Sequence, residues 1–461
     1  MGRCRCLKSS INPKREALPV STVIHDIDRI AVVFDDDNAV AAPGLLLVAT
    51  LITRLRLESL INTTVKLRGR VGGALPGRKV LTLVAMLLAG GTHIDHADLL
   101  RSGDTQKVLP FRVMAPSTLG TFLRSFTFGH IRQLDKVIAT ATARAWAAGA
   151  GPGDGEPVII DLDSTICRVY GKAKAGAAYG YTKVLGYHPL LATLASSGEV
   201  LHARMRKGSS QRGHNRFVEE LIARVRRAGA TGPITVRADA GFFAWKLTDT
   251  LTRLGLSWSV TVRINPSMRT AIEAIDDEAW VDIVYPDGGT AQVADTTYTT
   301  GAGRKKRSVR LVVRRTRLTE KSQQRLWPDW RHHAFVTNLD GTAVEVDRHH
   351  RAHAVVELNI RDLKEGAGME HCPSGVFFAN AAWLACAVLA HNLLRWTVRL
   401  GGMRPDELVV TRTIRRQLID LPGRLVNLSG TPTLRMPRNW PWRHSFTRAL
   451  DALRAVPAVP V

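Results

Sequence analysis

The chain has 461 residues, 45% of them hydrophobic, and its 64 Lys and Arg residues exceed its 40 Asp and Glu residues, giving a net charge of +24 at neutral pH. This length exceeds one ordinary hydrophobic core, so we expect several domains. Because the positive charge runs along the whole chain, it excludes a simple basic tail and favours a long contact with a polyanion, most often nucleic acid.

Cysteine usage and the first residues indicate a reducing, cytoplasmic compartment. The five cysteines are scattered, and Cys4 and Cys6 lack partners at zinc-finger spacing, so we predict neither disulfides nor structural zinc. Residues 1–15 are basic and lack the apolar core of a secretory signal. The apolar run Leu45–Ile52 is too short to cross a bilayer, so no membrane contact is expected.

Residues 1–150 are predicted to form an all-helical domain. A short strand is expected at Ile30–Phe34, and apolar residues then recur at helical spacing from Pro43 to Leu67. Further helices are predicted from about Gly77 to Gly90 and from His130 to Ala148. The glycine-rich run Gly149–Gly155 is typical of a linker and marks a domain boundary.

A helix start is predicted at Pro116, where Ser117 or Thr118 would cap the helix. Small hydroxylated residues near Arg124 suit contacts with DNA phosphates or base edges. The same pattern is equally typical of a plain structural helix. We therefore treat Ser117, Thr118 and Arg124 as candidate DNA-binding residues.

Asp161 and Asp163 lie at alternate positions in a β-branched run that begins at Val158. On a strand these two side chains project from the same face. A carboxylate beside a buried strand needs positive compensation, and hard divalent cations prefer such oxygens. A strand-end Asp that caps the following turn would give the same pattern when it stands alone.

Residues 151–264 show the order β-β-β-α-β-α-β and predict a mixed sheet flanked by helices. The second and third strands are expected at 184–194 and 200–205, as part of an antiparallel meander. A helix at 213–228 leads to a strand at 233–239 that ends in Asp239. Ligands of α/β sheets gather at the carboxyl ends of strands, so Asp239 joins the candidate site.

Residues 265–345 break this rhythm and are predicted to form a β-rich insertion. They contain the densest basic run of the chain, and a solvated hairpin is the alternative to a phosphate-binding surface. The candidate DNA-binding residues of this run are Arg304, Lys305, Lys306, Arg307, Arg310, Arg314 and Arg315.

Residues 346–398 are predicted to return to the α/β core. On one helix, His350, His353, Glu357 and Lys364 fall along a single stripe. An exposed amphipathic helix would show the same stripe. The long apolar helix that follows, Phe377–Trp396, is expected in the core, and residues 399–461 form a basic C-terminal segment.

In combination, Asp163, Asp239 and Glu357 resemble the DDE triad of bacterial insertion-sequence transposases, in the branch with a β-strand insertion before the Glu. The resemblance extends over nearly the whole chain and rests on the order and separation of several short motifs. These are Gly90-Gly91, Pro116–Gly120, Asp161–Thr165, Gly186–Leu190, Arg237–Phe242 and Glu357 with Lys364. The resemblance implies an α/β fold with an RNase H-like core.

The resemblance also implies a metal-dependent site. Two Mg²⁺ or Mn²⁺ ions per active site would be held by the three carboxylates, with Asp161 in a supporting position. Lys364 would contact phosphate. His350 and His353 stand where the family has Tyr and Arg, and Arg351 would compensate for that change. Trp327 or Trp330, in the insertion, would stack on a flipped base or simply belong to the core.

The implied function is a DNA transposase that binds terminal inverted repeats and catalyses strand cleavage and transfer into target DNA, with hairpin ends as one route. The implied state is a homodimer that pairs two DNA ends near the bacterial nucleoid. Two alternatives remain open: a catalytically inactive, transposase-derived DNA-binding protein, and an RNase H-like nuclease that cuts without joining.

Overall fold

The computed structural model describes the chain in stretches separated by short gaps. The described residues are 27–171, 173–180, 182–210, 213–285, 289–303, 306–317, 330–403, 408 and 410–460. Contacts divide the chain into Met1–Asp37 and Asn38–Val461. In the first unit, a 3-10 turn at Ile27–Arg29 precedes an exposed segment without regular secondary structure. The predicted strand at Ile30–Phe34 is therefore wrong, because β-branched residues form a strand only where a ladder partner is present.

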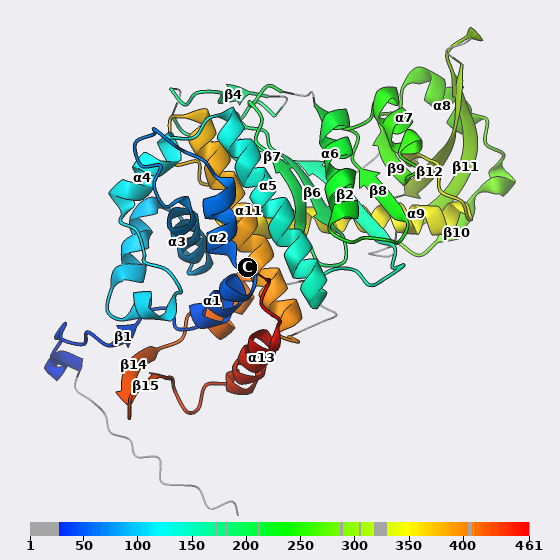
Figure 1. Cartoon of the computed structure of the whole chain (residues 1–461). Coiled ribbons are helices and arrows are strands. Elements are labelled where there is room, and N and C mark those ends of the chain that lie inside the picture. The colour runs from blue at the N-terminus through cyan, green and yellow to red at the C-terminus, as the bar shows by residue number, and fades with distance from the viewer. Residues whose placement is uncertain are drawn as a thin grey trace, which may run out of the picture. The chain divides into compact units, whose positions relative to one another are not determined.

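The predicted N-terminal helices are confirmed, with one change. The stretch 43–67 forms two helices, because Arg56 adopts a left-handed conformation with φ of 50° between them. The helices of this part are α1 (Leu45–Arg54), α2 (Leu57–Thr64), α3 (Pro76–Leu88), α4 (Pro116–Arg124) and α5 (Phe128–Ala145). Figure 1 shows them in blue and cyan around the long orange helix α11.

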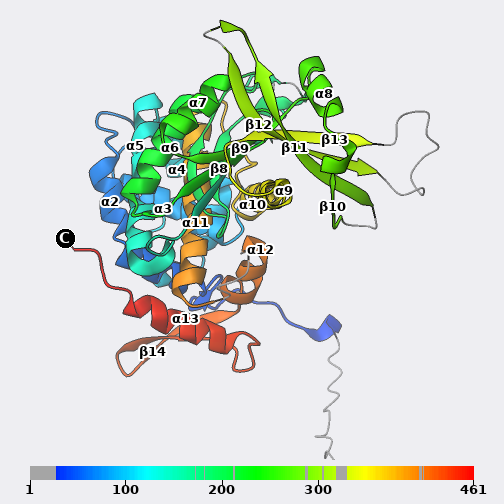
Figure 2. The ribbon, with the colours of Figure 1, turned by 90° about the vertical axis from the view of Figure 1, so that its right-hand side faces the viewer.

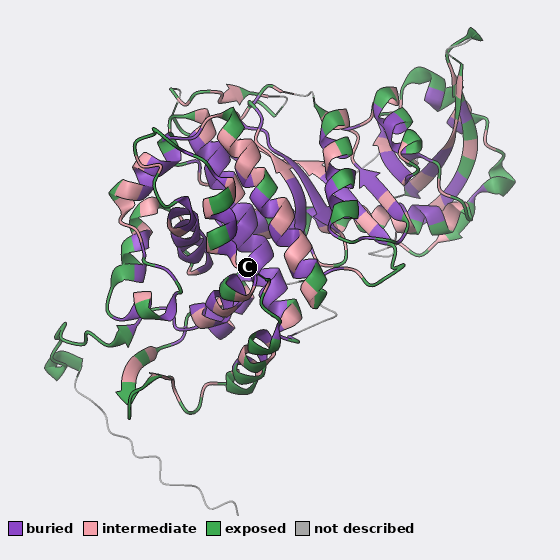
Figure 3. Ribbon diagram, in the orientation of Figure 1, coloured by how far each residue is buried: buried purple, intermediate pink, exposed green. Residues whose placement is uncertain are grey.

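Helix α11 (Phe377–Leu400) is the core of this helical layer, as predicted. It has the length and hydropathy of a membrane-spanning helix, but 83% of its most apolar window is buried inside the protein. It packs against α1, α3, α4 and α5 in one hydrophobic cluster (Figure 3). Asn380 and Asn392 are satisfied by hydrogen bonds, for example from the amide of Asn392 to the Val200 carbonyl at 2.8 Å.

A nine-stranded mixed sheet is built from strands between Val158 and Thr337, which confirms the predicted fold class (Figure 2). Its order is β10-β11-β12-β13-β9-β8-β2-β6-β7. Strands β2, β8 and β9 are parallel neighbours, whereas β2, β6 and β7 form the predicted antiparallel meander. The bounds are β2 Val158–Ser164, β6 Leu190–Leu194, β7 Val200–Arg204, β8 Ile234–Ala238 and β9 Ser257–Val262. Helices α6 (His214–Arg227) and α7 (Trp245–Arg253) pack on this part of the sheet.

The insertion is β-rich, as predicted, and it continues the central sheet. Strand β13 pairs with β9, so the insertion extends the same hydrogen-bonded ladder. Its elements are α8 (Pro266–Glu273), β10 (Val281–Ile283), β11 (Thr290–Thr300), β12 (Arg307–Arg317) and β13 (Arg331–Thr337). The basic strand β12 is thereby held between two other strands.

The remaining elements surround this frame. The predicted helix at 350–364 is divided into α9 (Ala343–Arg351) and α10 (Val355–Gly366) by a 3-10 turn. Two small sheets contain β3 (Cys167–Arg168), β4 (Ala178–Tyr179) and β5 (Leu185–Tyr187), and β1 (Ala39–Val40), β14 (Gly423–Leu428) and β15 (Thr431–Arg435). Helices α12 (Thr411–Ile414) and α13 (Arg443–Ala455) complete the chain. The five-part domain division stays a prediction.

Candidate active site

Two parallel strands place Asp163 and Asp239 side by side at one edge of the sheet. Leu162 of β2 is in register with Ala238 of β8. Asp163 directly follows Leu162, and Asp239 directly follows Ala238. Adjacent strands lie about 4.8 Å apart, so the two carboxylates face a common space. The Gly241 amide donates to Asp239 at 3.1 Å, and the Ser164 amide donates to Asp163 at 2.6 Å.

Asp161 has a different environment from Asp163. Its side chain is fully buried and accepts two hydrogen bonds from Arg237, at 2.7 and 2.8 Å. The Nδ1 atom of His353 lies 2.8 Å from the same carboxylate. Arg237 also donates to the carbonyl of His349, at 2.7 Å. Asp161 therefore fixes α9 and the following turn against the sheet, and its oxygens are already occupied.

Glu357 completes a group of three carboxylates. It lies exposed in the first turn of α10. The pKa of Asp163 is raised to about 6, mainly by burial and also by the negative charges of Asp239 and Glu357, while the Ser164 amide and His353 oppose this shift. The pKa of Asp239 is also raised, mainly by burial. The structure thus brings Asp239 and Glu357 close enough to Asp163 for their charges to raise its pKa.

This donor set fits a hard divalent cation. Three carboxylates offer only oxygen ligands, and burial together with the charges of Asp239 and Glu357 raises the pKa of Asp163, an effect that a bound cation would oppose. A second group of possible metal ligands lies elsewhere in the described part of the chain. It consists of Asp135, His202 and Glu220, whose ligand atoms lie within 4.8 Å of one another. The three carboxylates at the sheet edge are spread more widely.

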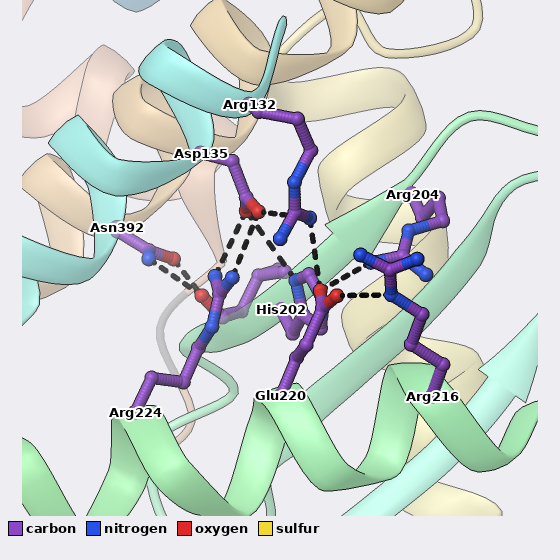
Figure 4. A network of polar contacts seen from close by, with 9 residues as sticks. Arg132, Asp135, His202, Arg204, Arg216, Glu220, Arg224 and Asn392 are labelled. Carbon is purple, nitrogen blue, oxygen red and sulfur yellow. Dashed lines mark hydrogen bonds and ion pairs between the residues drawn. The ribbon is translucent and has the colours of Figure 1, made fainter. Parts of the chain in front are cut away.

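The Asp135 group is an ion-pair network rather than a metal centre (Figure 4). It joins α5 to α6 and β7. Arg132 bridges Asp135 and Glu220 at 2.9 and 2.8 Å, and Arg224 pairs with Asp135 at 2.8 Å. Arg204 and Arg216 also pair with Glu220. A divalent cation here would face four guanidinium groups, so the carboxylates are compensated from within the protein.

His350, predicted to support the carboxylates or to contact phosphate, is held inside the fold, and its contact with phosphate stays a prediction. The side chain is buried, with Nδ1 2.7 Å from the Ser259 hydroxyl and Nε2 2.9 Å from the Thr261 hydroxyl. Its ring stacks on Phe335 at a centroid distance of 4.0 Å. Burial lowers the pKa of His350 to about 3, so the ring is neutral and both nitrogens are engaged. His353, by contrast, remains at the carboxylate group.

Arg351 and Arg314, predicted to contact phosphate or DNA, both form ion pairs within the protein. Both pair with Asp347, which is fully buried, at 2.8 and 2.9 Å. Lys364 donates to the carbonyl of Ile166 at 3.0 Å, which places its ammonium group near the end of β2. A cavity of about 510 Å³ lies beside His353 and is lined in part by Tyr285, Arg314 and His333.

Three further arginines of β12 are paired as well. Arg307 pairs with Asp249, Arg310 with Asp295 at 2.8 Å, and Arg315 with Asp277 at 3.4 Å. Lys306 precedes β12 and is exposed, whereas Arg304 and Lys305 lie outside the described residues.

Of the two tryptophans predicted to stack on a base, the structure describes Trp330, whose ring is covered by two arginines. The guanidinium groups of Arg315 and Arg317 lie over the Trp330 ring, with centroid distances of 4.8 and 4.9 Å. Trp327 lies outside the described residues. Sequence reasoning did not single out Trp280, which also packs against Arg315, at 4.2 Å. Base stacking in the insertion stays a prediction.

The N-terminal candidates lie on α4. The helix begins at Pro116 with Ala115 as its N-cap, and no side chain caps it, so the capping role of Ser117 or Thr118 was wrong. Proline at the first helical position explains this start, since its fixed φ suits the helix. Ser117 and Arg124 are exposed. Helix α4 packs against α3 and α11, so these residues belong to the helical layer.

Sequence reasoning missed two supporting residues. Arg237 was noted only as part of a motif, yet it neutralises Asp161 directly across two parallel strands. His188, in the Gly186–Leu190 motif, lies 2.9 Å through Nε2 from the Ser164 hydroxyl, next to Asp163. An Arg and an Asp within two β-rich runs were a signal for the first pair, but only the strand register shows that they face each other.

Comparison with known proteins identifies the class. The family model described as transposase DDE domain group 1 matches residues 24–458, so the chain belongs to this family and is a DDE transposase, a polynucleotidyl transferase that acts on DNA. No curated protein matches the chain. Among solved structures, it is similar to the piggyBac transposase in a synaptic complex with hairpin DNA, with a TM-score of 0.42 and 12% identity over 81% of this chain and 79% of that one.

Proposed function

We propose that Asp163, Asp239 and Glu357 are the catalytic carboxylates and that they bind two Mg²⁺ or Mn²⁺ ions. The observation that carries the proposal is the placement of the two Asp residues at the ends of adjacent parallel strands, with Glu357 within electrostatic reach. Bound ions would lower the pKa of an attacking water or 3′-hydroxyl and neutralise the leaving oxygen.

The residues around the triad have distinct proposed roles. Arg237 and His353 hold Asp161, and this contact fixes the turn that leads to Glu357. Lys364, near the end of β2, would contact a phosphate of the DNA strand. His350 is integrated by two hydrogen bonds and a ring stack, which supports a working variant of the family pattern over a decayed one.

The substrate that we propose is the terminal inverted repeat of the chain's own insertion sequence, followed by target DNA. The net charge of +24 suits a long duplex contact. Cleavage through hairpin ends, a homodimer that pairs two ends, and a place at the bacterial nucleoid are parts of the same proposal and rest on the family alone.

The test is cleavage of a duplex that carries the repeats flanking the gene, with Mg²⁺ or with EDTA. We expect Mg²⁺-dependent cleavage by the wild type, at least a hundredfold loss in Asp163→Asn, and unchanged DNA binding by that variant. Asp154→Asn, at an exposed Asp held by Thr231, is the matched control and should cleave normally. Full cleavage by Asp163→Asn would exclude the assignment. Cleavage without joining to a second duplex would instead favour the nuclease.

A further inference from the structure

The C-terminal segment carries exposed arginines that lack the acidic partners seen elsewhere. Between residues 410 and 460 the acidic residues are Asp420 and Asp451. We define the C-terminal arginine surface as Arg412, Arg416, Arg435, Arg438 and Arg448, all of which are exposed. Within the described part of the chain, no ion pair or hydrogen bond involves the guanidinium groups of these five residues. Their charges are therefore available to a partner.

The register of the C-terminal hairpin adds a second observation. Arg435 of β15 lies directly opposite Arg424 of β14. Residues that face each other across antiparallel strands have Cβ atoms about 5 Å apart, and like charges at such positions are destabilising. The register therefore places a basic residue, and no acidic one, directly across from Arg435.

The scaffold under this surface is anchored to the helix that carries Glu357. The amide and hydroxyl of Thr411 both donate to Asp362 of α10, at 2.8 and 2.7 Å. Arg415 donates to the carbonyls of Leu88 and Gly366. Glu357 and Asp362 are five residues apart on α10, so the first residue of α12, Thr411, is attached about 7.5 Å along the helix axis from Glu357.

The loop before α13 joins the same scaffold. Trp440 donates through Nε1 to the carbonyl of Gln417, at 2.9 Å. This bond brings the loop that holds Arg438 beside the turn that holds Arg416. Trp440 also packs on Trp442 at a centroid distance of 5.7 Å, so these rings serve the scaffold and leave the arginines to meet a partner.

We propose that the C-terminal arginine surface binds the phosphate backbone of the DNA duplex where it leaves the active site. The inference rests on the proposed function for its substrate. Guanidinium groups bind phosphate in a bidentate manner, and contacts to phosphate carry no sequence information. The surface therefore holds any duplex equally and adds affinity rather than sequence preference.

The experiment compares two full-length variants that lose the same charge. The test variant replaces Arg412, Arg416, Arg435, Arg438 and Arg448 with Gln. The control variant replaces five other exposed basic residues with Gln, namely Arg112, Lys136, Arg227, Lys246 and Arg269. Circular dichroism and melting confirm that each variant folds. Binding is measured by fluorescence anisotropy on two unrelated 30-bp duplexes, in EDTA, from about 50 to 300 mM salt.

We expect the slope of log affinity against log salt to fall in the test variant by about 0.9 for each phosphate that the protein no longer neutralises, and so by up to about 4.5. Both duplexes should lose affinity by the same factor. The control variant should keep most of its slope. Equal slopes for the two variants, or a weaker affinity for one duplex alone, would overturn the proposal. Binding to anionic phosphatidylglycerol vesicles is measured in parallel. A test variant that binds duplex DNA normally but no longer binds these vesicles would also overturn the proposal.

Failure of this inference is distinguishable from failure of the proposed function. Binding is measured without metal, so it does not depend on Asp163, Asp239 or Glu357. If the test variant kept a normal salt slope and the wild type showed Mg²⁺-dependent cleavage, only the DNA-binding role of the C-terminal arginine surface would be overturned. A reduced slope with no cleavage by the wild type would keep the surface and exclude the catalytic assignment.

Discussion

Strand β12 of the insertion and the C-terminal segment are both rich in arginine, yet their arginines lie in opposite surroundings. Arg310, Arg314 and Arg315 each pair with an Asp from another part of the fold. Arg412, Arg416 and Arg448 are exposed and have no such partner among the residues described. A dense basic run in a sequence is thus no measure of free positive charge, because a compact β layer also gathers acids around it.

The acidic residues divide in the same way. Asp161 and Asp347 are fully buried and compensated by arginines. Asp163 is half-buried, has acidic neighbours, and has a raised pKa. The compensated acids hold the fold together, whereas Asp163 is the acid that we propose as a metal ligand. Breaking an ion pair of a compensated acid should therefore lower the free energy of unfolding, whereas removing the charge of Asp163 should raise it.

The largest effect on stability is expected from Arg314→Gln. This change leaves the buried carboxylate of Asp347 with Arg351 alone, and breaking a buried pair costs roughly 3 kcal/mol. Urea unfolding measures the loss. The salt dependence of DNA binding should stay unchanged, because Arg314 is already paired. A lower salt slope with normal stability would show that Arg314 contacts phosphate after all.

A somewhat smaller effect, of opposite sign, is expected from Asp163→Asn in EDTA. The pKa of Asp163 is about 6 in the folded protein, against the ordinary value of 3.8 that applies to the unfolded chain. The folded protein therefore binds a proton at Asp163 more tightly than the unfolded chain does. The resulting stabilisation is present below about pH 4 and is lost as the pH rises through about 6. At pH 7.5 the free energy of unfolding of the variant should therefore exceed that of the wild type by roughly 2–3 kcal/mol. This difference should vanish near pH 4, and urea unfolding at the two pH values measures it.

Thermal melting of the wild type and of Asp163→Asn, with and without Mg²⁺, provides the control. Added Mg²⁺ should raise the melting temperature of the wild type, because the cation binds the folded form and neutralises the triad. It should leave Asp163→Asn nearly unchanged. If the wild type did not respond to Mg²⁺ or Mn²⁺, the metal assignment would be wrong.

The smallest effects come from a matched pair of single substitutions. Arg310→Gln removes a partly exposed ion pair with Asp295 and two hydrogen bonds to carbonyls, so we expect a loss of about 1 kcal/mol. Arg435→Gln removes a repulsive neighbour of Arg424, so we expect a gain of a few tenths of a kcal/mol. Differential scanning calorimetry resolves the two signs. A loss of stability in both variants would contradict the contrast between the regions.

Local pattern was sufficient to predict most of the elements. The helices of the N-terminal layer, the meander, the β-rich insertion and the buried helix α11 follow the periodicity of apolar residues, which depends on neighbours a few positions away. The positions of Asp163 and Asp239 at strand ends were predicted for the same reason. The strand at Ile30–Phe34 failed because a strand also needs a partner that the local sequence does not supply.

Tertiary structure alone decided which charged groups are free. Arg237 and Asp161 are 76 residues apart, and His353 and Asp161 are 192 apart, yet all three meet in one buried contact. Asp163, two residues away, takes no part in that contact and is the carboxylate that we propose as a metal ligand. The sequence by itself determined which residue types stand at the ends of the strands. Only the folded chain determined their ionisation and pairing, because electrostatic energy depends on distance and burial, which sequence separation does not reveal.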